Sequence, residues 1–384
     1  MAIRIAPTLA GMAAYPFVVL EEARRRLVAE GVTVIDFGKG DPNEPTDPII
    51  RDALVAALPE RSPYPLAAGL PELRAAAAGW VERRFGVLLD PDTEIVPTYG
   101  SKEAIFSLAQ VLVDPAAEKR VVLYGEPAYP VYERGALFAG AEVGTVPLVR
   151  EHGFLPDLDA IPASTLERTA IFWVNYPHNP TGAVAPLTFY DELCALAAEH
   201  AFVVASDEAY TELWFDEPPV SALQASDRSR TIVFQTLSKR SSMTGYRSGF
   251  VAAPAEVVAA LKSYRPTVGT APQEFVQRAS VVAWGDERHV EETRARYARK
   301  RDVLLPVLEA KGWEVVASDA TMYLWVAVPT GEGSEDVALR LLEHGVIVSP
   351  GTFFGPSGEG YIRFALVPTL EECEAAAAIL EEQL

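Results

Sequence analysis

The chain has 384 residues, of which 49% are hydrophobic, and it carries a formal net charge of −20. Because a single hydrophobic core stops growing below this length, we expect one large and one small domain. The acidic charge argues against nucleic acid as a partner, since a phosphate backbone requires a basic surface.

The first twenty residues are mildly apolar, but Pro7, Gly11 and Pro16 interrupt any helical core of a signal peptide. No stretch of about 18 uncharged apolar residues occurs in the sequence, so we expect no membrane partner. The two cysteines, Cys194 and Cys373, lack metal-ligand spacing and are expected to be reduced thiols of a cytoplasmic protein. The five histidines are scattered, so we expect no metal.

Short apolar runs alternate with helical stretches through the middle of the chain. Such runs are typical of parallel strands that helices cover on both faces. The expected strands span 121–125, 170–174, 202–206, 231–235 and 248–253. This alternation predicts an α/β sheet with a site at the carboxyl ends of its strands.

The last third of the chain has a different pattern. We expect a charged helix over 287–311, a strand in MYLWVAV, a helix over 334–344, strands in VIVS and YIRFALV, and a final helix from residue 369. This pattern predicts a small α+β domain over 276–384 and a large domain over 46–275. Residues 1–45 are expected to form an arm that joins the small domain.

Two segments early in the large domain suit an anion and a flat ring. In TYGSKEAIF (98–106), a glycine precedes Ser101 and a helical pattern, so backbone N–H groups and the helix start can bind an anion. In EPAYPVY (126–132), Tyr129 follows a strand and can stack on a planar ring. Taken alone, the first segment favours an ordinary helix start and the second favours a packed core tyrosine.

Two further segments follow apolar strands. In NYPHNPTGAV (175–184), Asn179 precedes a turn that presents its amide rigidly. In VVASDEAYTEL (203–213), Asp207 ends a strand, where a carboxylate is costly without a cation such as a protonated pyridine nitrogen. Tyr210 can donate to a phenolate oxygen of the same ring. The structural alternatives are a simple turn and a helix N-cap.

The segment TLSKRSSMTGYRSGF (236–250) comes directly after a strand, so Lys239 can point into a crevice. Ser238 offers a hydroxyl, and Arg247 offers a planar donor fork for phosphate. Arg363, inside the apolar strand YIRFALV, requires a carboxylate, either of a substrate or of an internal salt bridge. Together these segments supply the groups that pyridoxal-5′-phosphate (PLP) chemistry needs.

The chain resembles the fold-type I PLP enzymes of aminotransferase class I/II over nearly its whole length. The motifs that carry this resemblance occur in the family's order: GDP (40–42), YPLAAGLPELR (64–74), GSKEAI, PAYP, HNPTG, SDEAY and SK-x7-R. The resemblance implies a large domain with a mostly parallel seven-stranded sheet sandwiched by helices, and a smaller α+β domain. It also implies ping-pong transamination through pyridoxamine phosphate.

The resemblance assigns the ring of PLP to five residues. Lys239 is the Schiff-base lysine and proton shuttle, and Asp207 pairs with the ring nitrogen. Asn179 and Tyr210 hold the ring oxygen, and Tyr129 stacks on the ring. The residues implied to bind the phosphate are Ser101, Lys102 through its backbone, Thr236, Ser238 and Arg247.

Other implied roles concern the substrate and a second subunit. Arg363 clamps the α-carboxylate, aided by Asn179 and by the backbone of Gly40. Tyr64 resembles the tyrosine that reaches the phosphate in the other subunit, which implies a homodimer with shared sites.

Four details are similar to succinyldiaminopimelate aminotransferases: AAYPF (13–17), GSKEAIF with AQVLVDP, LSKRS with GYRSGFVA, and YLW (323–325). This similarity implies N-succinyl-LL-diaminopimelate and 2-oxoglutarate as substrates. Arg240 and Arg265 are candidates for the extra carboxylates, and Tyr15 with Phe17 can close over the substrate. The alternatives are another class I/II aminotransferase, acting on aspartate, alanine, aromatic acids or LL-diaminopimelate, a PLP-dependent C–S lyase, or a PLP-binding regulator.

Overall fold

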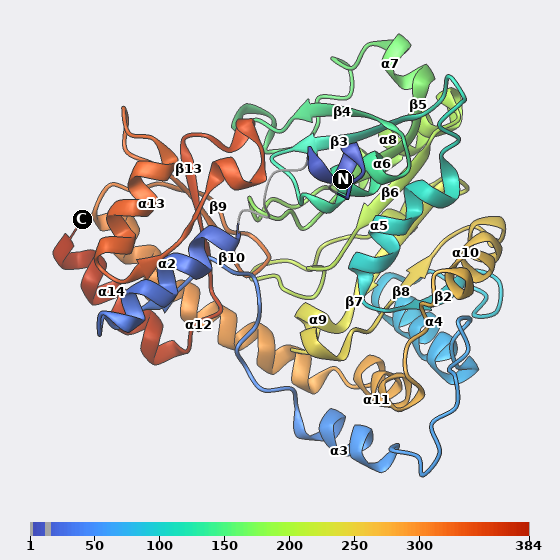
Figure 1. The fold of residues 1–384 in the computed structure, drawn as a ribbon, viewed down its shortest axis with the longest axis horizontal. Coiled ribbons are helices and arrows are strands. Elements are labelled where there is room, and N and C mark those ends of the chain that lie inside the picture. The colour runs from blue at the N-terminus through green and yellow to red at the C-terminus, as the bar shows by residue number, and fades with distance from the viewer. Residues whose placement is uncertain (1–2, 12–16, 384) are drawn as a thin grey trace.

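The computed structural model describes residues 3–11 and 17–383, which form a large domain and a small domain (Figure 1). The large domain is built on a seven-stranded sheet with the order β2-β8-β7-β6-β5-β3-β4. Its strands are β2 (Ile95–Thr98), β3 (Val121–Glu126), β4 (Glu142–Pro147), β5 (Thr169–Val174), β6 (Val203–Asp207), β7 (Thr231–Thr236) and β8 (Gly249–Ala252). Only β8 runs antiparallel to its neighbours. The expected fold class, with a mostly parallel sheet, is therefore confirmed.

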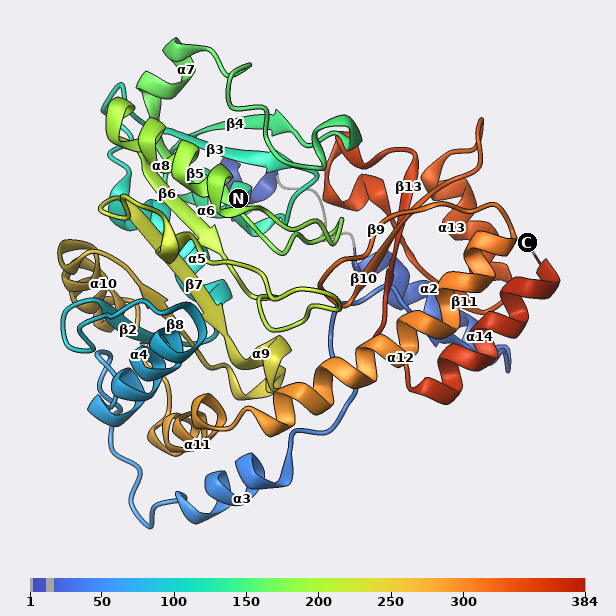
Figure 2. The same cartoon turned by 180° about the vertical axis from the view of Figure 1, so that it is seen from behind.

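Helices cover both faces of this sheet, as Figures 1 and 2 show. In β7, Ile232 and Phe234 pack into the core on one face, whereas Val233 packs into the core on the other. The first core also contains side chains of α5 (Ser101–Leu112), α6 (Val131–Phe138) and α10 (Ala255–Thr267). The second contains side chains of α4 (Pro71–Phe85), α8 (Leu187–His200) and α11 (Glu274–Gly285). Burial on both faces explains why the strands are continuous apolar runs.

The small domain combines two sheets with long helices. An antiparallel sheet has the order β12-β13-β10-β9, and β1 pairs in parallel with β11. Its strands are β1 (Ile35–Asp36), β9 (Val315–Ala317), β10 (Tyr323–Ala327), β11 (Val346–Ile347), β12 (Ser349–Pro350) and β13 (Tyr361–Ala365). Its helices are α2 (Phe17–Ala29), α13 (Ser334–Glu343) and α14 (Leu370–Gln383). The remaining helices are α1 (Pro7–Ala10), α3 (Pro48–Ala56), α7 (Ala163–Arg168), α9 (Leu237–Arg240) and α12 (Arg288–Ala310).

The long helix α12 connects the two domains (Figure 1). The helix before it, α11, packs against α3 and α4 of the large domain. We therefore propose a boundary at residues 286–287, between α11 and α12, whereas the sequence pattern placed it at residue 275. An apolar helix face does not reveal in the sequence which domain covers it.

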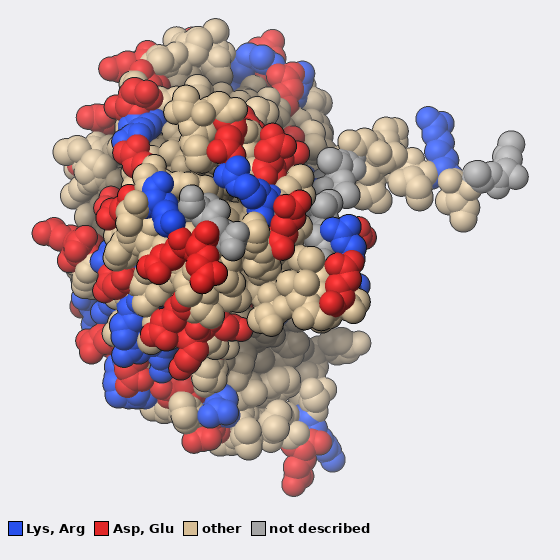
Figure 3. Space-filling model, turned by 90° about the vertical axis from the view of Figure 1, so that its left-hand side faces the viewer, with Lys and Arg blue, Asp and Glu red and all other residues tan. Residues whose placement is uncertain are grey.

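The N-terminal arm has two parts that behave differently. After residue 16 it joins the small domain, because β1 pairs with β11 and Leu27 packs against Leu342 and Ile347. Residues 3–11 are exposed throughout, and Figure 3 shows the N-terminal segment standing away from the body. Within residues 3–11 and 17–383, no helix is long and apolar enough to cross a membrane.

Candidate active site

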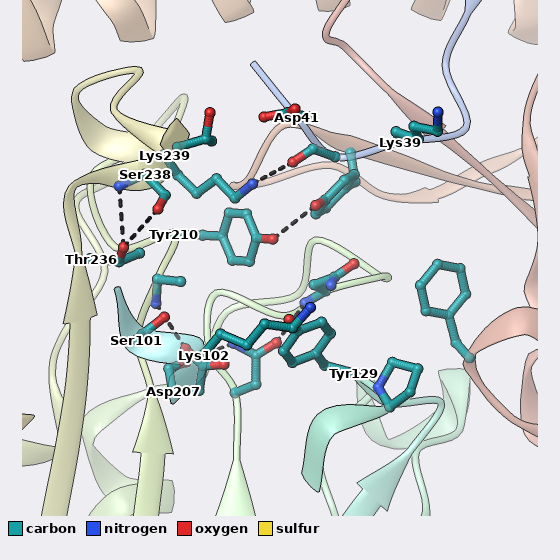
Figure 4. Close-up of a pocket in the computed structure, with 18 of the residues that line it drawn as sticks. Lys39, Asp41, Ser101, Lys102, Tyr129, Asp207, Tyr210, Thr236, Ser238 and Lys239 are labelled. Carbon is teal, nitrogen blue, oxygen red and sulfur yellow. Dashed lines mark hydrogen bonds between the residues drawn. The ribbon is translucent and has the colours of Figure 1, made fainter. Parts of the chain in front are cut away.

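A cavity of about 580 Å³ lies where the carboxyl ends of β5, β6 and β7 face the small domain (Figure 4). Asp207 is the last residue of β6, and Thr236 is the last residue of β7. The cavity brings together most of the site residues expected from the sequence: Gly40, Ser101, Lys102, Tyr129, Asn179, Asp207, Tyr210, Thr236, Ser238, Lys239, Arg247 and Arg363. Residues 199 positions apart in the sequence, Gly40 and Lys239, are in direct contact there.

Lys239 reaches the cavity from α9, the short turn that follows β7. Thr236 caps this turn, because its hydroxyl accepts a hydrogen bond from the backbone N–H of Ser238 at 3.2 Å. The Nζ atom of Lys239 donates to the carbonyl oxygen of Gly40. This contact fixes the amine across the cavity from its own strand, as Figure 4 shows.

The surroundings of Lys239 favour its neutral form. Burial lowers the pKa of Lys239 to about 8, Asp41 opposes that shift, and the neighbouring cations of the cavity reinforce it. An amine with this pKa is about one-tenth proton-free at pH 7, a far larger fraction than an ordinary lysine has. Lys239 is therefore suited to nucleophilic attack and to proton transfer.

Asp207 lies on the opposite side of the cavity, and its side chain is only 5% exposed. The hydroxyl of Tyr132 donates to its Oδ2 atom at 2.8 Å, and the side-chain amide of Asn175 donates to its backbone carbonyl at 2.6 Å. Burial raises the pKa of Asp207 to about 6, and the hydrogen bonds from Tyr132 and Ala209 act against that shift. A carboxylate in this position gains from a cation beside it, so a protonated pyridine nitrogen of PLP fits the site.

A cradle for an anion lies at the start of α5. Gly100 has φ +70°, and a Cβ atom on it would lie 2.4 Å from Nη2 of Arg247. Ser101 begins α5, whose first N–H groups have no acceptor within the helix and carry the positive end of its dipole. The hydroxyls of Thr236 and Ser238, 3.0 Å apart, complete this wall. Backbone N–H groups, hydroxyls and a guanidinium together fit a phosphate.

Arg363 is 2% exposed and projects into the cavity from β13 of the small domain. Its Nη1 atom donates to Oδ1 of Asn179 at 2.8 Å, and its Nη2 atom donates to the carbonyl oxygen of Gly38 at 2.8 Å. The rings of Tyr323 and Phe354 lie 4.2 and 4.6 Å from its guanidinium carbon. Neutral acceptors and aromatic rings hold the guanidinium in place, an arrangement suited to a substrate carboxylate.

Several residues that line the cavity or support its lining were not singled out from the sequence. Tyr132 supports Asp207, and the hydroxyl of Tyr323 lies 2.8 Å from that of Tyr210. Lys39 and Asp41 line the wall beside Gly40. Tyr132 stands within the segment EPAYPVY and Tyr323 within YLW, but nothing in a linear motif shows where their hydroxyls point.

Arg240 does not line the cavity, contrary to the expectation that it binds a substrate carboxylate. It is 2% exposed and lies near the rings of Trp80 and Trp284, at 5.7 and 5.0 Å from their centroids. It donates to the carbonyl oxygen of Ala283 at 2.6 Å and to Glu287 at 2.8 Å. Its guanidinium therefore ties α9 to the segment around α11 and α12.

Arg265 is also a structural residue. It has no exposed surface, donates to the carbonyl oxygens of Pro97 and Ala67 at 2.7 and 2.8 Å, and forms an ion pair with Glu103. These acceptors lie on separate segments, which explains why a buried cation is retained there. The expectation that Arg265 binds substrate was wrong, because it does not reach the cavity.

Two expected residues remain, Tyr64 and Tyr15. Tyr64 is fully exposed and does not line the cavity of its own chain. Tyr15 lies outside the described residues, so the expected lid is not located.

Among residues 3–11 and 17–383, no group of three or more His, Cys, Asp or Glu side chains could hold a metal ion.

The site thus combines a lysine, a buried carboxylate, an anion cradle and a fixed arginine. Comparison of the sequence and the fold with known proteins agrees with this arrangement. Residues 32–380 match the family described as aminotransferase class I and II. The chain belongs to this family. Like other class I/II aminotransferases, it is PLP-dependent.

The relatives of this aminotransferase cover nearly its whole length. An LL-diaminopimelate aminotransferase of Aquifex aeolicus is 42% identical over 372 residues, or 95% of each chain. An aminotransferase structure from Neisseria meningitidis has a TM-score of 0.91 at 37% identity and covers 99% of this chain and 100% of its own. A probable N-succinyldiaminopimelate aminotransferase from Thermus thermophilus has a TM-score of 0.88 at 32% identity and covers 96% and 100%.

Proposed function

We propose that this aminotransferase transfers an amino group from LL-diaminopimelate to 2-oxoglutarate. The observation that carries the proposal is the 42% identity to a relative named LL-diaminopimelate aminotransferase, over 95% of both chains. The second candidate is the N-succinylated substrate expected from the sequence, which a relative at 32% identity supports. Both substrates share the same reacting amino acid end and differ only at the distal end.

We propose that the cavity residues act on the shared end as the family resemblance implies. When bound, PLP supplies an aldehyde that condenses with amines and a ring that accepts an electron pair. Asp207 holds a proton at the ring nitrogen, and the hydroxyl of Tyr210 donates to the ring oxygen. The side chain of Tyr129 covers the ring from its position on the cavity wall.

The phosphate would lie in the cradle at the start of α5, formed by the backbone of Ser101 and Lys102 and by the side chains of Ser101, Thr236, Ser238 and Arg247. Arg363, positioned by Asn179, binds the α-carboxylate of the substrate. Lys239, with a pKa of about 8, accepts the proton released at the substrate Cα atom and later returns one. The order of events predicts ping-pong kinetics, because the amino donor leaves as an oxo acid before the acceptor binds.

A comparison of amino donors tests the proposed substrate. The purified enzyme is mixed with LL-diaminopimelate, N-succinyl-LL-diaminopimelate, aspartate or alanine, each with 2-oxoglutarate, and the formation of glutamate is measured. We expect the highest kcat/KM with LL-diaminopimelate. A higher kcat/KM with the succinylated donor would overturn the proposal in favour of the second candidate.

We also propose that the enzyme is a homodimer in which Tyr64 of each subunit reaches the phosphate of the other. Tyr64 and Leu66 are 101% and 70% exposed, and Ile3 on the projecting N-terminal segment is 91% exposed. A second cavity of about 510 Å³ adjoins the phosphate cradle and shares Lys102 and Arg247 with the first. It has an aromatic lining of Tyr99, Phe106, Phe138 and Tyr264, which suits an incoming tyrosine.

Subunit mixing tests the shared sites. Lys239→Ala and Tyr64→Ala proteins are each expected to be poorly active, but a hybrid dimer contains one site with both residues intact. We expect activity to rise when the two variants are unfolded, mixed and refolded together. Activity equal to the mean of the separately refolded variants would contradict the exchange of Tyr64, and sedimentation as a monomer would contradict the dimer.

A further inference from the structure

Lys39 and Asp41 are two charged residues of the cavity to which the proposed chemistry gives no role. The phosphate, the ring nitrogen and the α-carboxylate are each matched to other groups. What remains beside Gly40 is one cation and one anion, two positions apart in the sequence. A wall that carries both signs of charge suits a ligand group that also carries both.

Lys39 and Asp41 lie in a segment that contacts both the carboxylate clamp and the reacting lysine. The segment before Lys39 touches the carboxylate clamp, since the carbonyl oxygen of Gly38 accepts from Arg363. The carbonyl oxygen of Gly40 accepts from the reacting amine of Lys239. A substrate held at its carboxylate by Arg363 and at its Cα atom near Lys239 would therefore have residues 38–41 as one wall for its side chain. Figure 4 shows Lys39 and Asp41 on the opposite side of the cavity from Asp207 and Ser101.

The backbone of this segment is held firmly, so the two side chains start from fixed points. The N–H of Gly38 donates to Asp36 at 2.8 Å, and the hydroxyl of Ser349 donates to the Gly38 carbonyl oxygen at 2.7 Å. Gly40 packs so closely on Tyr323 that a Cβ atom there would lie 2.1 Å from its hydroxyl oxygen. Fixed side-chain origins make discrimination between substrates possible, because little ordering is needed on binding.

We infer that Lys39 and Asp41 determine the substrate specificity of this enzyme by binding the distal carboxylate and the distal ammonium group of LL-diaminopimelate. This inference rests on the proposed function and adds the residues that recognise the distal end. The N-succinylated compound has no distal ammonium group and carries an additional carboxylate. Asp41 repels that carboxylate, so the same pair disfavours the succinylated donor.

Substitutions that remove one charge at a time test the two contacts. Lys39→Met removes the cation with little change in length, and Lys39→Arg retains it. Asp41→Asn removes the anion. Because Asp41 also acts on the pKa of Lys239, its loss affects every donor, and only ratios of kcat/KM between donors are informative. Lys311→Met, on an exposed lysine that donates to the backbone carbonyl oxygen of Glu381, is the matched control outside the cavity.

We expect Lys39→Met to lower the ratio of kcat/KM for LL-diaminopimelate over alanine roughly tenfold, because one hydrogen-bonded charge contributes about a factor of ten. Lys39→Arg and Lys311→Met should preserve this ratio. Asp41→Asn should lower the ratio for LL-diaminopimelate over N-succinyl-LL-diaminopimelate about fivefold or more. An unchanged ratio in either variant overturns the corresponding contact.

Binding without turnover provides an independent measurement. Pimelate has the carbon skeleton of diaminopimelate, and heptanoate lacks only its second carboxylate. Calorimetry on the PLP-loaded enzyme should show that Lys39→Met weakens pimelate roughly tenfold and heptanoate much less. Equal weakening of both acids overturns the role of Lys39.

Failure of the proposed function is distinguishable from failure of this inference. If the wild-type enzyme converts other amino acids but not LL-diaminopimelate, the proposed donor and the role of Asp41 are both overturned. The contact of Lys39 is then decided by the ratio of glutamate over alanine in the first half-reaction, measured on the PLP-loaded enzyme without an acceptor, since glutamate also carries a distal carboxylate. If Lys39→Met lowers that ratio, the contact of Lys39 is supported. If the ratio is unchanged in Lys39→Met, the contact is overturned.

Discussion

Replacement of Tyr132 by phenylalanine isolates the support that Asp207 receives from a single hydrogen bond. Asp207 accepts from the hydroxyl of Tyr132 at 2.8 Å and from the backbone N–H of Ala209 at a longer 3.3 Å. The ring of Tyr132 stacks on Trp173 with centroids 4.9 Å apart, and phenylalanine retains that contact. The substitution therefore removes a donor to the carboxylate and leaves the packing in place.

The size of the effect follows from the charge on the acceptor. A hydrogen bond to an ionised group contributes about 1.5–3 kcal/mol, which corresponds to roughly one to two pKa units. Burial already raises the pKa of Asp207 to about 6, and the Tyr132 hydroxyl opposes that shift, so its loss raises the pKa further. The charged carboxylate is the form that stabilises a protonated ring nitrogen, and this form is lost as the pH falls through the higher pKa.

The pH profile of kcat/KM between pH 5.5 and 9 measures this effect. We expect the acid limb of Tyr132→Phe to move upward by about one unit, so that its deficit relative to wild type is roughly tenfold larger at pH 6 than at pH 8.5. Tyr124→Phe is the matched control, because Tyr124 lies 6.3 Å from Tyr132 in the same aromatic cluster without contacting Asp207. A Tyr132→Phe profile parallel to that of wild type at every pH would refute the reasoning.

Three further substitutions address other parts of the site and the core. Lys239→Ala should leave no covalent PLP adduct after borohydride treatment, and peptide mass spectrometry that finds an adduct would remove the lysine from its role. Arg363→Ala should raise the KM for all amino donors by about tenfold or more, since each donor loses the same carboxylate contact, and an unaltered KM would contradict the clamp. Burial raises the pKa of Glu208 to about 7, so folded protein binds its proton more tightly than unfolded protein and loses stability as the pH rises from about 4.5 to 7. Glu208→Gln should flatten that decline in the free energy of unfolding of the PLP-free protein, by about 1.4 kcal/mol for each unit of pKa shift that is removed. Urea denaturation at several pH values measures the decline. If the variant shows the same decline as wild type, Glu208 is not its source.

The strands and the principal reacting groups were determined locally and could be predicted from the sequence. Strands covered on both faces must be apolar throughout, as the run around Val233 shows, so they stand out without any knowledge of their neighbours. Parallel strands place their carboxyl ends at one edge of the sheet, so polar residues directly after them, such as Asp207 and Lys239, are predictable members of one site.

Which charged side chains face the cavity was decided only by the tertiary structure. Arg240 follows the reacting lysine directly, yet it turns toward Trp284 of α11 and toward Glu287, the residue before α12. Lys39 is 200 positions away from that lysine and lines the cavity with it. Side chains adjacent in a helical turn point in different directions, whereas distant segments are brought together by packing, and a linear sequence records neither the direction nor the packing.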